Sequence, residues 1–99
     1  SPQAVAAFLP DPNDLQDDDN KTIASYLNYY EALATGIHLG IYDIETLDFL
    51  AGPRIMKLFD NYRPWIIGRR EAFDEHTLFV EFEYLADEVR RRRALDPVR

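Results

Sequence analysis

Apolar residues recur at three- and four-residue steps in four stretches of this chain, the spacing that places side chains on one face of an α-helix. The first stretch predicts a helix over residues 19–39, with a core face made of Ile23, Leu27, Tyr30, Ala34 and Ile37. Gly40 follows this stretch, and glycine readily adopts the left-handed conformation that ends a helix. The pattern therefore predicts one long amphipathic helix that ends just before Gly40.

A short helix and a long one are predicted next. Asp43 suits the N-cap of the short helix, in which Ile44, Leu47 and Leu50 are expected to face inward. Gly52-Pro53 is expected to end it and to begin the third helix, because proline is tolerated in a first turn. The third helix spans residues 53–70, and Pro64 predicts a kink or a break because it removes a backbone donor. Its core face holds Ile55, Leu58, Phe59, Tyr62, Trp65 and Ile66.

The fourth helix is predicted over residues 75–94, with Leu78, Phe82, Leu85, Ala86 and Val89 inward. The alternating pattern of β-strands is almost absent. The fold class is therefore all-α: a compact bundle of three long helices plus one short helix, the third helix kinked at Pro64. We assign residues 1–18 to an N-terminal arm and acidic lead-in, and residues 19–96 to a single helical-bundle domain.

The length and composition of the chain limit the number of domains and the kinds of site that it can contain. The 99 residues suffice for one domain with one modest core. The absence of cysteine excludes disulfides and thiolate metal sites, and a cytoplasmic location is expected. No apolar run approaches the ~20 residues that cross a bilayer, so no membrane insertion is expected in this segment. The chain does not begin with Met, which is compatible with a piece of a longer protein.

The formal net charge of −7 is unevenly distributed. The first fifty residues hold nine acids and a single base, Lys21, whereas the remainder holds nine acids and ten bases. An acidic domain is repelled by nucleic acid at long range, so phosphate binding would require a segregated basic face. The basic second half keeps nucleic-acid binding as an alternative.

An ordered series of motifs resembles one family. The series begins with Leu27-Asn28-Tyr29-Tyr30-Glu31 and Gly36-Ile37-His38-Leu39-Gly40-Ile41-Tyr42-Asp43. It continues with Arg63-Pro64-Trp65-Ile66-Ile67-Gly68-Arg69-Arg70 and Phe79-Val80-Glu81-Phe82-Glu83-Tyr84-Leu85-Ala86. Over residues 23–90 the chain resembles a bacterial and phage family catalogued as domain of unknown function 4760. Thr46 departs from the acidic residue usual there. The resemblance implies a compact helical domain and no known reaction.

Glu31 is the most notable acid, because it flanks the apolar face of the first helix and is expected to be partly buried. A buried carboxylate must be paired or protonated. An ion pair with Arg63, Arg69 or Arg70 is the favoured interpretation, and a general acid or base is the alternative. His38 and His76 lack the spacing of metal ligands, so no metal, cofactor or catalytic residue is assigned and no enzyme is expected.

Four consecutive arginines, Arg90, Arg91, Arg92 and Arg93, form the strongest charge feature. We favour a solvated helix end that complements the helix dipole, with local pairs such as Glu88–Arg92. Contacts to phosphate are the alternative.

Aromatic residues are numerous, and those at the edges of the predicted core faces are candidates for a partner surface: Tyr26, Tyr29, Tyr42, Trp65 and Tyr84. The favoured hypothesis is a non-enzymatic module that binds a protein partner or forms a homo-oligomer. The alternative is a nucleic-acid-binding accessory domain that uses the arginine-rich third and fourth helices.

Overall fold

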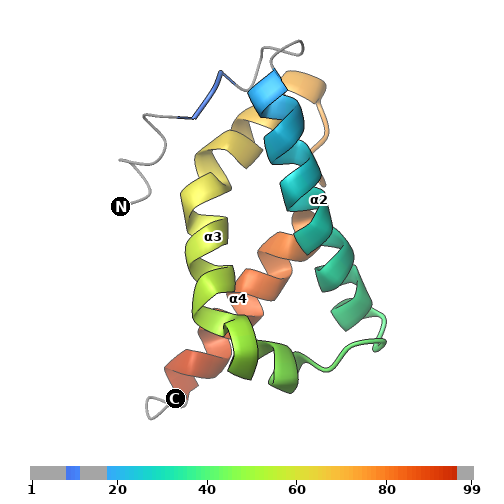
Figure 1. Ribbon diagram of the computed structural model, residues 1–99, viewed down its shortest axis with the longest axis vertical. Coiled ribbons are helices and arrows are strands. Elements are labelled where there is room, and N and C mark those ends of the chain that lie inside the picture. The colour runs from blue at the N-terminus through green and yellow to red at the C-terminus, as the bar shows by residue number, and fades with distance from the viewer. Residues whose placement is uncertain (1–8, 12–17, 96–99) are drawn as a thin grey trace.

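In the computed structural model, which describes residues 9–11 and 18–95, the chain forms three α-helices and no strand. They are α2 (Asp18–His38), α3 (Ile44–Phe73) and α4 (Val80–Leu95). Successive helices run in opposite directions along the long axis of the molecule (Figure 1). The all-α prediction is confirmed. The predicted N-terminal arm lies outside the described residues, except for residues 9–11 and Asp18.

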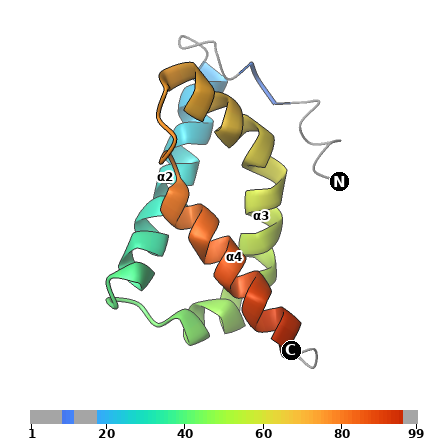
Figure 2. The same ribbon diagram turned by 180° about the vertical axis from the view of Figure 1, so that it is seen from behind.

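The core forms where α4 packs against both other helices. Figures 1 and 2 show α4 crossing on one side of α2 and α3, and it contacts each of them extensively. From α4, Phe82, Ala86 and Val89 are fully buried. The core faces predicted for the three long helices are confirmed, because the buried apolar side chains include Leu27, Ala34, Ile55, Phe59, Ile66, Phe82, Leu85, Ala86 and Val89.

The second and third predicted helices are one helix. Asp43 is the N-cap of α3, as predicted, and its carboxylate accepts hydrogen bonds from the backbone N–H groups of Glu45 and Thr46. The predicted boundary at Gly52-Pro53 is wrong, because α3 continues through both residues. A residue before proline normally avoids the helical region because its Cβ meets the proline ring, and glycine has no Cβ. The first turns of α3 lie across the base of the molecule before the helix turns upward (Figures 1 and 2).

Helix α3 also continues through Pro64, so the break considered there is wrong, whereas a kink stays a prediction. The helix ends at Asp74, which adopts the left-handed conformation with φ of 53°. A turn then extends to Phe79, and α4 therefore begins at Val80 rather than at residue 75. Phe79 itself has a φ of 58°, which is incompatible with the interior of a right-handed helix. This backbone conformation explains the late start of α4.

The turn between α2 and α3 is fixed by its backbone. Gly40 has a φ of 77°, which confirms the predicted left-handed residue at the end of the helix. The N–H of Ile41 donates to the carbonyl of Gly36 at 2.8 Å, and that of Gly40 donates to Ile37 at 3.0 Å. These are the two hydrogen bonds of a Schellman motif. The Tyr42 ring covers Gly36 so closely that a Cβ there would collide with it.

At the other end of the molecule, Trp65 is linked to Asp11 through Asn20 of α2. Its Nε1 donates to Oδ1 of Asn20 at 2.7 Å, and Nδ2 of Asn20 donates to the carbonyl of Asp11 at 2.7 Å. Trp65 is only 2% exposed, so its assignment to a partner surface is wrong. Asn20 is also buried. Its amide oxygen accepts the hydrogen bond of the indole N–H, which would find no acceptor among apolar side chains.

Candidate protein-interaction surface

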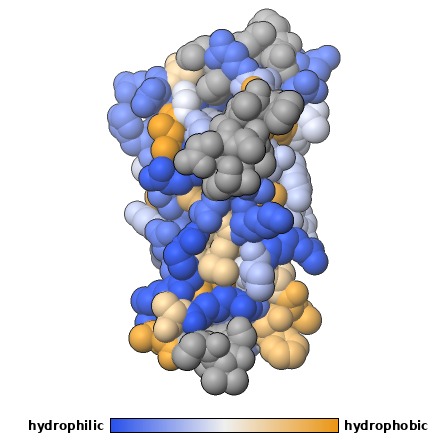
Figure 3. Space-filling view, turned by 90° about the vertical axis from the view of Figure 1, so that its left-hand side faces the viewer, coloured by the Kyte–Doolittle hydropathy of each residue, from blue (hydrophilic) through white to orange (hydrophobic). Residues whose placement is uncertain are grey.

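Five large apolar side chains project into solvent around the α2–α3 turn. Each is more than half exposed, and Phe49 reaches 83%. We call this surface the apolar corner, and it consists of Leu39, Ile41, Tyr42, Phe49 and Leu50. In Figure 3, hydrophobic atoms gather at the lower end of the molecule, where the first turns of α3 lie, while its middle is largely hydrophilic. A concentration of exposed apolar side chains is typical of a site that contacts another molecule.

A groove of about 360 Å³ runs beside these side chains. Ile41, Tyr42 and Leu50 of the apolar corner line it, and its remaining lining residues are Leu33, Asp43, Thr46 and Leu47. The hydroxyl of Thr46 donates to Asp43 at 2.7 Å and is the main reason that the pKa of this carboxyl lies below its usual value. The groove is therefore apolar, with one fixed negative charge at its rim.

The register of α3 explains why Phe49 and Leu50 face solvent. The buried positions at its start are Asp48, Gly52 and Ile55, which follow the 3.6-residue period of a helix. The series Ile44, Leu47 and Leu50 advances by three residues at each step, so it turns away from the core face. The predicted inward position of Leu50 is therefore wrong, since this side chain is 70% exposed.

A buried ion pair holds this register. Asp48 is 0% exposed, and its Oδ1 accepts from Nε of Arg93 at 2.9 Å. Nη2 of the same arginine donates to the carbonyl of Asp48 at 2.9 Å. Gly52 leaves the necessary space, because a Cβ there would collide with both side chains. A sequence signal existed: a lone acid in register with Ile55 and an arginine run elsewhere in the chain.

The other predicted partner-surface aromatics are exposed but lie in different places. Tyr42 belongs to the apolar corner, whereas Tyr84 lies on α4. Tyr26 and Tyr29 lie on α2, where both pack edge to face with Tyr30 at 5.3 Å between ring centroids. Tyr30 in turn stacks on the buried Phe82. The aromatic set predicted as one surface is thus divided among the corner, α2, α4 and, for Trp65, the core.

Replacement of Tyr26 by phenylalanine is expected to lower the pKa of Tyr30. The two hydroxyl oxygens lie 3.4 Å apart, and this hydrogen bond, followed by burial, raises the pKa of Tyr30 to about 12. Because its pKa is raised above the usual 10.0, Tyr30 stabilises the fold below pH 10.0 and loses that contribution as the pH approaches about 12. The near-ultraviolet absorbance of tyrosinate, followed during alkaline titration, measures the change. An unaltered titration in the variant would contradict this assignment.

Glu31 makes contacts that the sequence did not reveal. Its Oε1 accepts from the backbone N–H of Phe82 at 2.8 Å, and its Oε2 accepts from that of Glu81 at 3.3 Å. These are the second and third residues of α4, whose N–H groups lack partners within the helix. Phe79, which precedes α4, has no side-chain oxygen. Glu31 therefore caps α4 from a neighbouring helix.

The predicted ion pair between Glu31 and an arginine is absent from the described residues. Arg70 donates to Oε1 of Glu83 at 2.9 Å and to the carbonyl of Leu78 at 2.8 Å. The guanidinium of Arg69 lies over the rings of Trp65 and Phe73. Arg63 is exposed near the middle of α3. The prediction failed because the backbone N–H groups of Glu81 and Phe82, rather than a guanidinium, donate to the Glu31 carboxylate.

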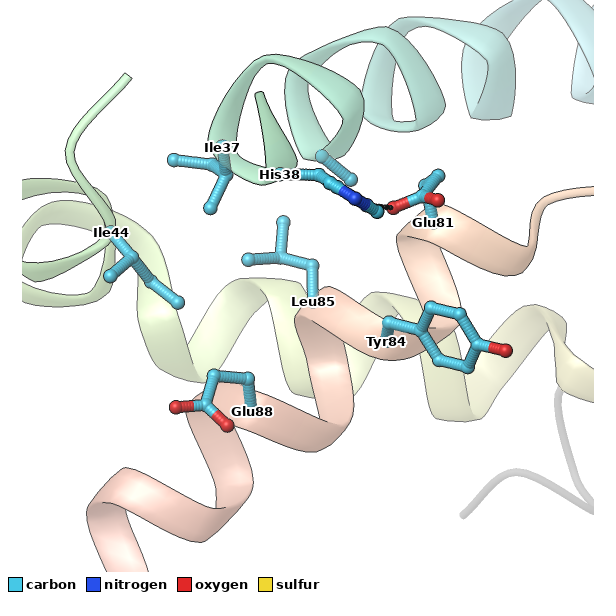
Figure 4. Close-up of a pocket in the computed structure, with 8 residues that line it drawn as sticks. Ile37, His38, Ile44, Glu81, Tyr84, Leu85 and Glu88 are labelled. Carbon is cyan, nitrogen blue, oxygen red and sulfur yellow. Dashed lines mark hydrogen bonds and ion pairs between the residues drawn. The ribbon is translucent and has the colours of Figure 1, made fainter. Parts of the chain in front are cut away.

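A second groove, of about 180 Å³, is lined by residues of α2 and α4 and by the first residue of α3. Figure 4 shows Ile37, Ile44 and Leu85 around it, with the His38 ring directed at Glu81. Nδ1 of His38 lies 2.8 Å from Oε2 of Glu81. Within residues 9–11 and 18–95, no group of three or more potential metal ligands comes together.

All four arginines of the run form ion pairs with carboxylates. Arg90 contacts Asp60 at 2.8 Å, and Arg93 contacts Asp48. Both Arg91 and Arg92 contact Glu88, which confirms the predicted Glu88–Arg92 pair. The hydrogen bond from Arg91 holds the pKa of Glu88 below its usual value. Arg90 and Arg93 therefore connect α4 to α3, whereas the ion pairs of Arg91 and Arg92 lie within α4.

Comparison with known proteins gives one match. A family model described as a domain of unknown function (DUF4760) matches residues 2–89, which include α2, α3 and the first part of α4. No curated protein and no solved structure matches the chain. Among the described helices, none combines the length and the apolar character needed to cross a membrane. The chain belongs to the family of domain of unknown function 4760.

Proposed function

We propose that this protein is a non-enzymatic interaction module that docks a protein partner through the apolar corner. The observation that carries this proposal is the exposure of Leu39, Ile41, Tyr42, Phe49 and Leu50 beside an apolar groove. Exposed side chains of this size gain free energy when another surface removes them from water. Aromatic residues such as Tyr42 and Phe49 are also enriched at the centres of protein interfaces.

Nucleic-acid binding through the arginines is the weaker candidate. Phosphate would compete at these arginines with Asp48, Asp60 and Glu88, the carboxylates that they already bind. Arg70 is likewise engaged, by Glu83. The net charge of −7 adds long-range repulsion from a polyanion. A mobility-shift titration tests this alternative, because affinity that falls steeply with salt would support it.

Site-specific photo-crosslinking in the native host cells tests the proposed surface. A photoreactive phenylalanine analogue at position 49 is expected to yield covalent adducts with protein. The matched control places the same analogue at position 57, since Lys57 is exposed on the same helix two turns farther along. Adducts with nucleic acid, or equal protein adducts from both positions, would contradict the proposed surface.

A further inference from the structure

We propose that the partner of the apolar corner is a second copy of this chain, bound in a two-fold symmetric dimer. This inference rests on the proposed function, because it identifies the partner of the same surface. Phe49 of each copy enters the groove beside α3 of the other copy. The dimer thus contains two identical contacts related by symmetry.

The apolar corner contains both parts of such a contact, a projecting side chain and a groove that could receive it. Phe49 is 83% exposed and is the most exposed of the large apolar side chains described. Leu50, the next residue, lines the groove of about 360 Å³. Consecutive residues on a helix point about 100° apart, so the projecting ring lies beside the groove rather than inside it. A cavity of roughly 150 Å³ holds a benzene ring, so the groove has room for one phenylalanine side chain.

A surface with a projection and a groove side by side is complementary to itself. In a two-fold dimer, the contact of residue i with residue j is matched by the contact of j with i. Each copy therefore fills the groove of its partner and has its own groove filled. A partner of different sequence would need to reproduce both features separately.

The exposed area agrees with the requirements of a stable dimer. Taking roughly 200 Å² for one fully exposed large side chain, the apolar corner offers on the order of 600 to 700 Å² in each copy. A standard protein interface buries about 800 Å² per partner, part of it polar. Full coverage of the corner would supply most of that area from apolar side chains alone.

Charge predicts how the dimer responds to salt. Two copies that each carry a net charge of −7 repel one another, and added salt screens this repulsion. Dimerisation through apolar side chains should therefore strengthen, or stay constant, as salt is raised. Binding to nucleic acid has the opposite dependence.

Sedimentation velocity over a range of protein and salt concentrations tests the dimer. The chain is expected to reach twice its mass of 11.5 kDa. Phe49→Glu should raise the dimer dissociation constant about 30-fold or more, as for a central interface residue. Tyr29→Glu is the matched control, because Tyr29 is 66% exposed on α2 outside the corner. The fluorescence of the buried Trp65, the single tryptophan, verifies that each variant remains folded.

Disulfide trapping tests the predicted contact. The chain has no cysteine, so each introduced one is unique. Copies with Phe49→Cys mixed with copies carrying Ile41→Cys should form a mixed covalent dimer faster than either forms one with itself. A monomer at every concentration, or a dimer that Tyr29→Glu weakens more than Phe49→Glu, would overturn the dimer. If position 49 then still crosslinks to other proteins, the proposed function stands without the dimer, whereas absence of both results overturns both.

Discussion

Replacement of Arg93 by alanine is expected to lower the free energy of unfolding by about 3 kcal/mol. The substitution removes two hydrogen bonds to Asp48, a side chain that is 0% exposed. Breaking a buried ion pair costs roughly 3–5 kcal/mol, because the remaining charge loses its oppositely charged neighbour without regaining water. We expect a loss at the lower end of this range, since the Arg93 side chain is 20% exposed to solvent. Urea unfolding followed by the fluorescence of Trp65 measures the loss.

The neighbouring arginine provides the control. Arg91 pairs with Glu88 within α4, and both side chains keep contact with water. Exposed pairs of this kind contribute little to stability. Arg91→Ala should therefore leave unfolding nearly unchanged. Equal effects of Arg91→Ala and Arg93→Ala would show that the Asp48–Arg93 pair does not hold α3 to α4.

Replacement of Glu31 by alanine is expected to lower the free energy of unfolding by about 2 kcal/mol. The carboxylate accepts from the amides of Glu81 and Phe82, and a hydrogen bond to a charged group contributes roughly 1.5–3 kcal/mol. Its negative charge also complements the positive end of the α4 dipole. Glu31→Gln keeps an acceptor oxygen and loses the charge, so its effect should be smaller. Thermal unfolding followed by circular dichroism measures both variants.

Amide hydrogen exchange locates the effect of Glu31. In Glu31→Ala, the amides of Glu81 and Phe82 should lose protection before those in the middle of α4, because only the first turn loses its acceptor. Glu45→Ala is the matched control, since Glu45 is an exposed acid in the first turn of α3. Unchanged protection at Glu81 and Phe82 would refute the capping role of Glu31.

The parts of the fold that depend on neighbouring residues were predictable from the sequence. Asp43 and Gly40 act within one or two turns, so their capping roles follow from local chemistry. The burial of Leu27 or Phe82 follows from helical periodicity. Gly52-Pro53 misled the prediction because a local breaker signal was outweighed by a continuous core face on both sides of it.

The parts that depend on distant residues were not predictable. The partners of Glu31 lie about fifty residues away in the chain, and nothing near Glu31 indicates that α4 lacks a cap of its own. Trp65 is amphipathic and suits either an interface or a core. It can be buried here because Asn20, 45 residues away in the chain, accepts a hydrogen bond from its indole N–H. The apolar corner was missed except for Tyr42, because Leu50 fits a three-residue series that the true register of α3 excludes.

The central place of α4 has a consequence for the order of assembly during synthesis. The helix that both others pack against is the one that leaves the ribosome last. Until it emerges, α2 and α3 share few contacts, such as the hydrogen bond between Asn20 and Trp65, and the amides that Glu31 binds do not yet form a helix end. We therefore expect most of the core to form late, once α4 has emerged, and a chain interrupted before residue 80 to lack most of the native packing.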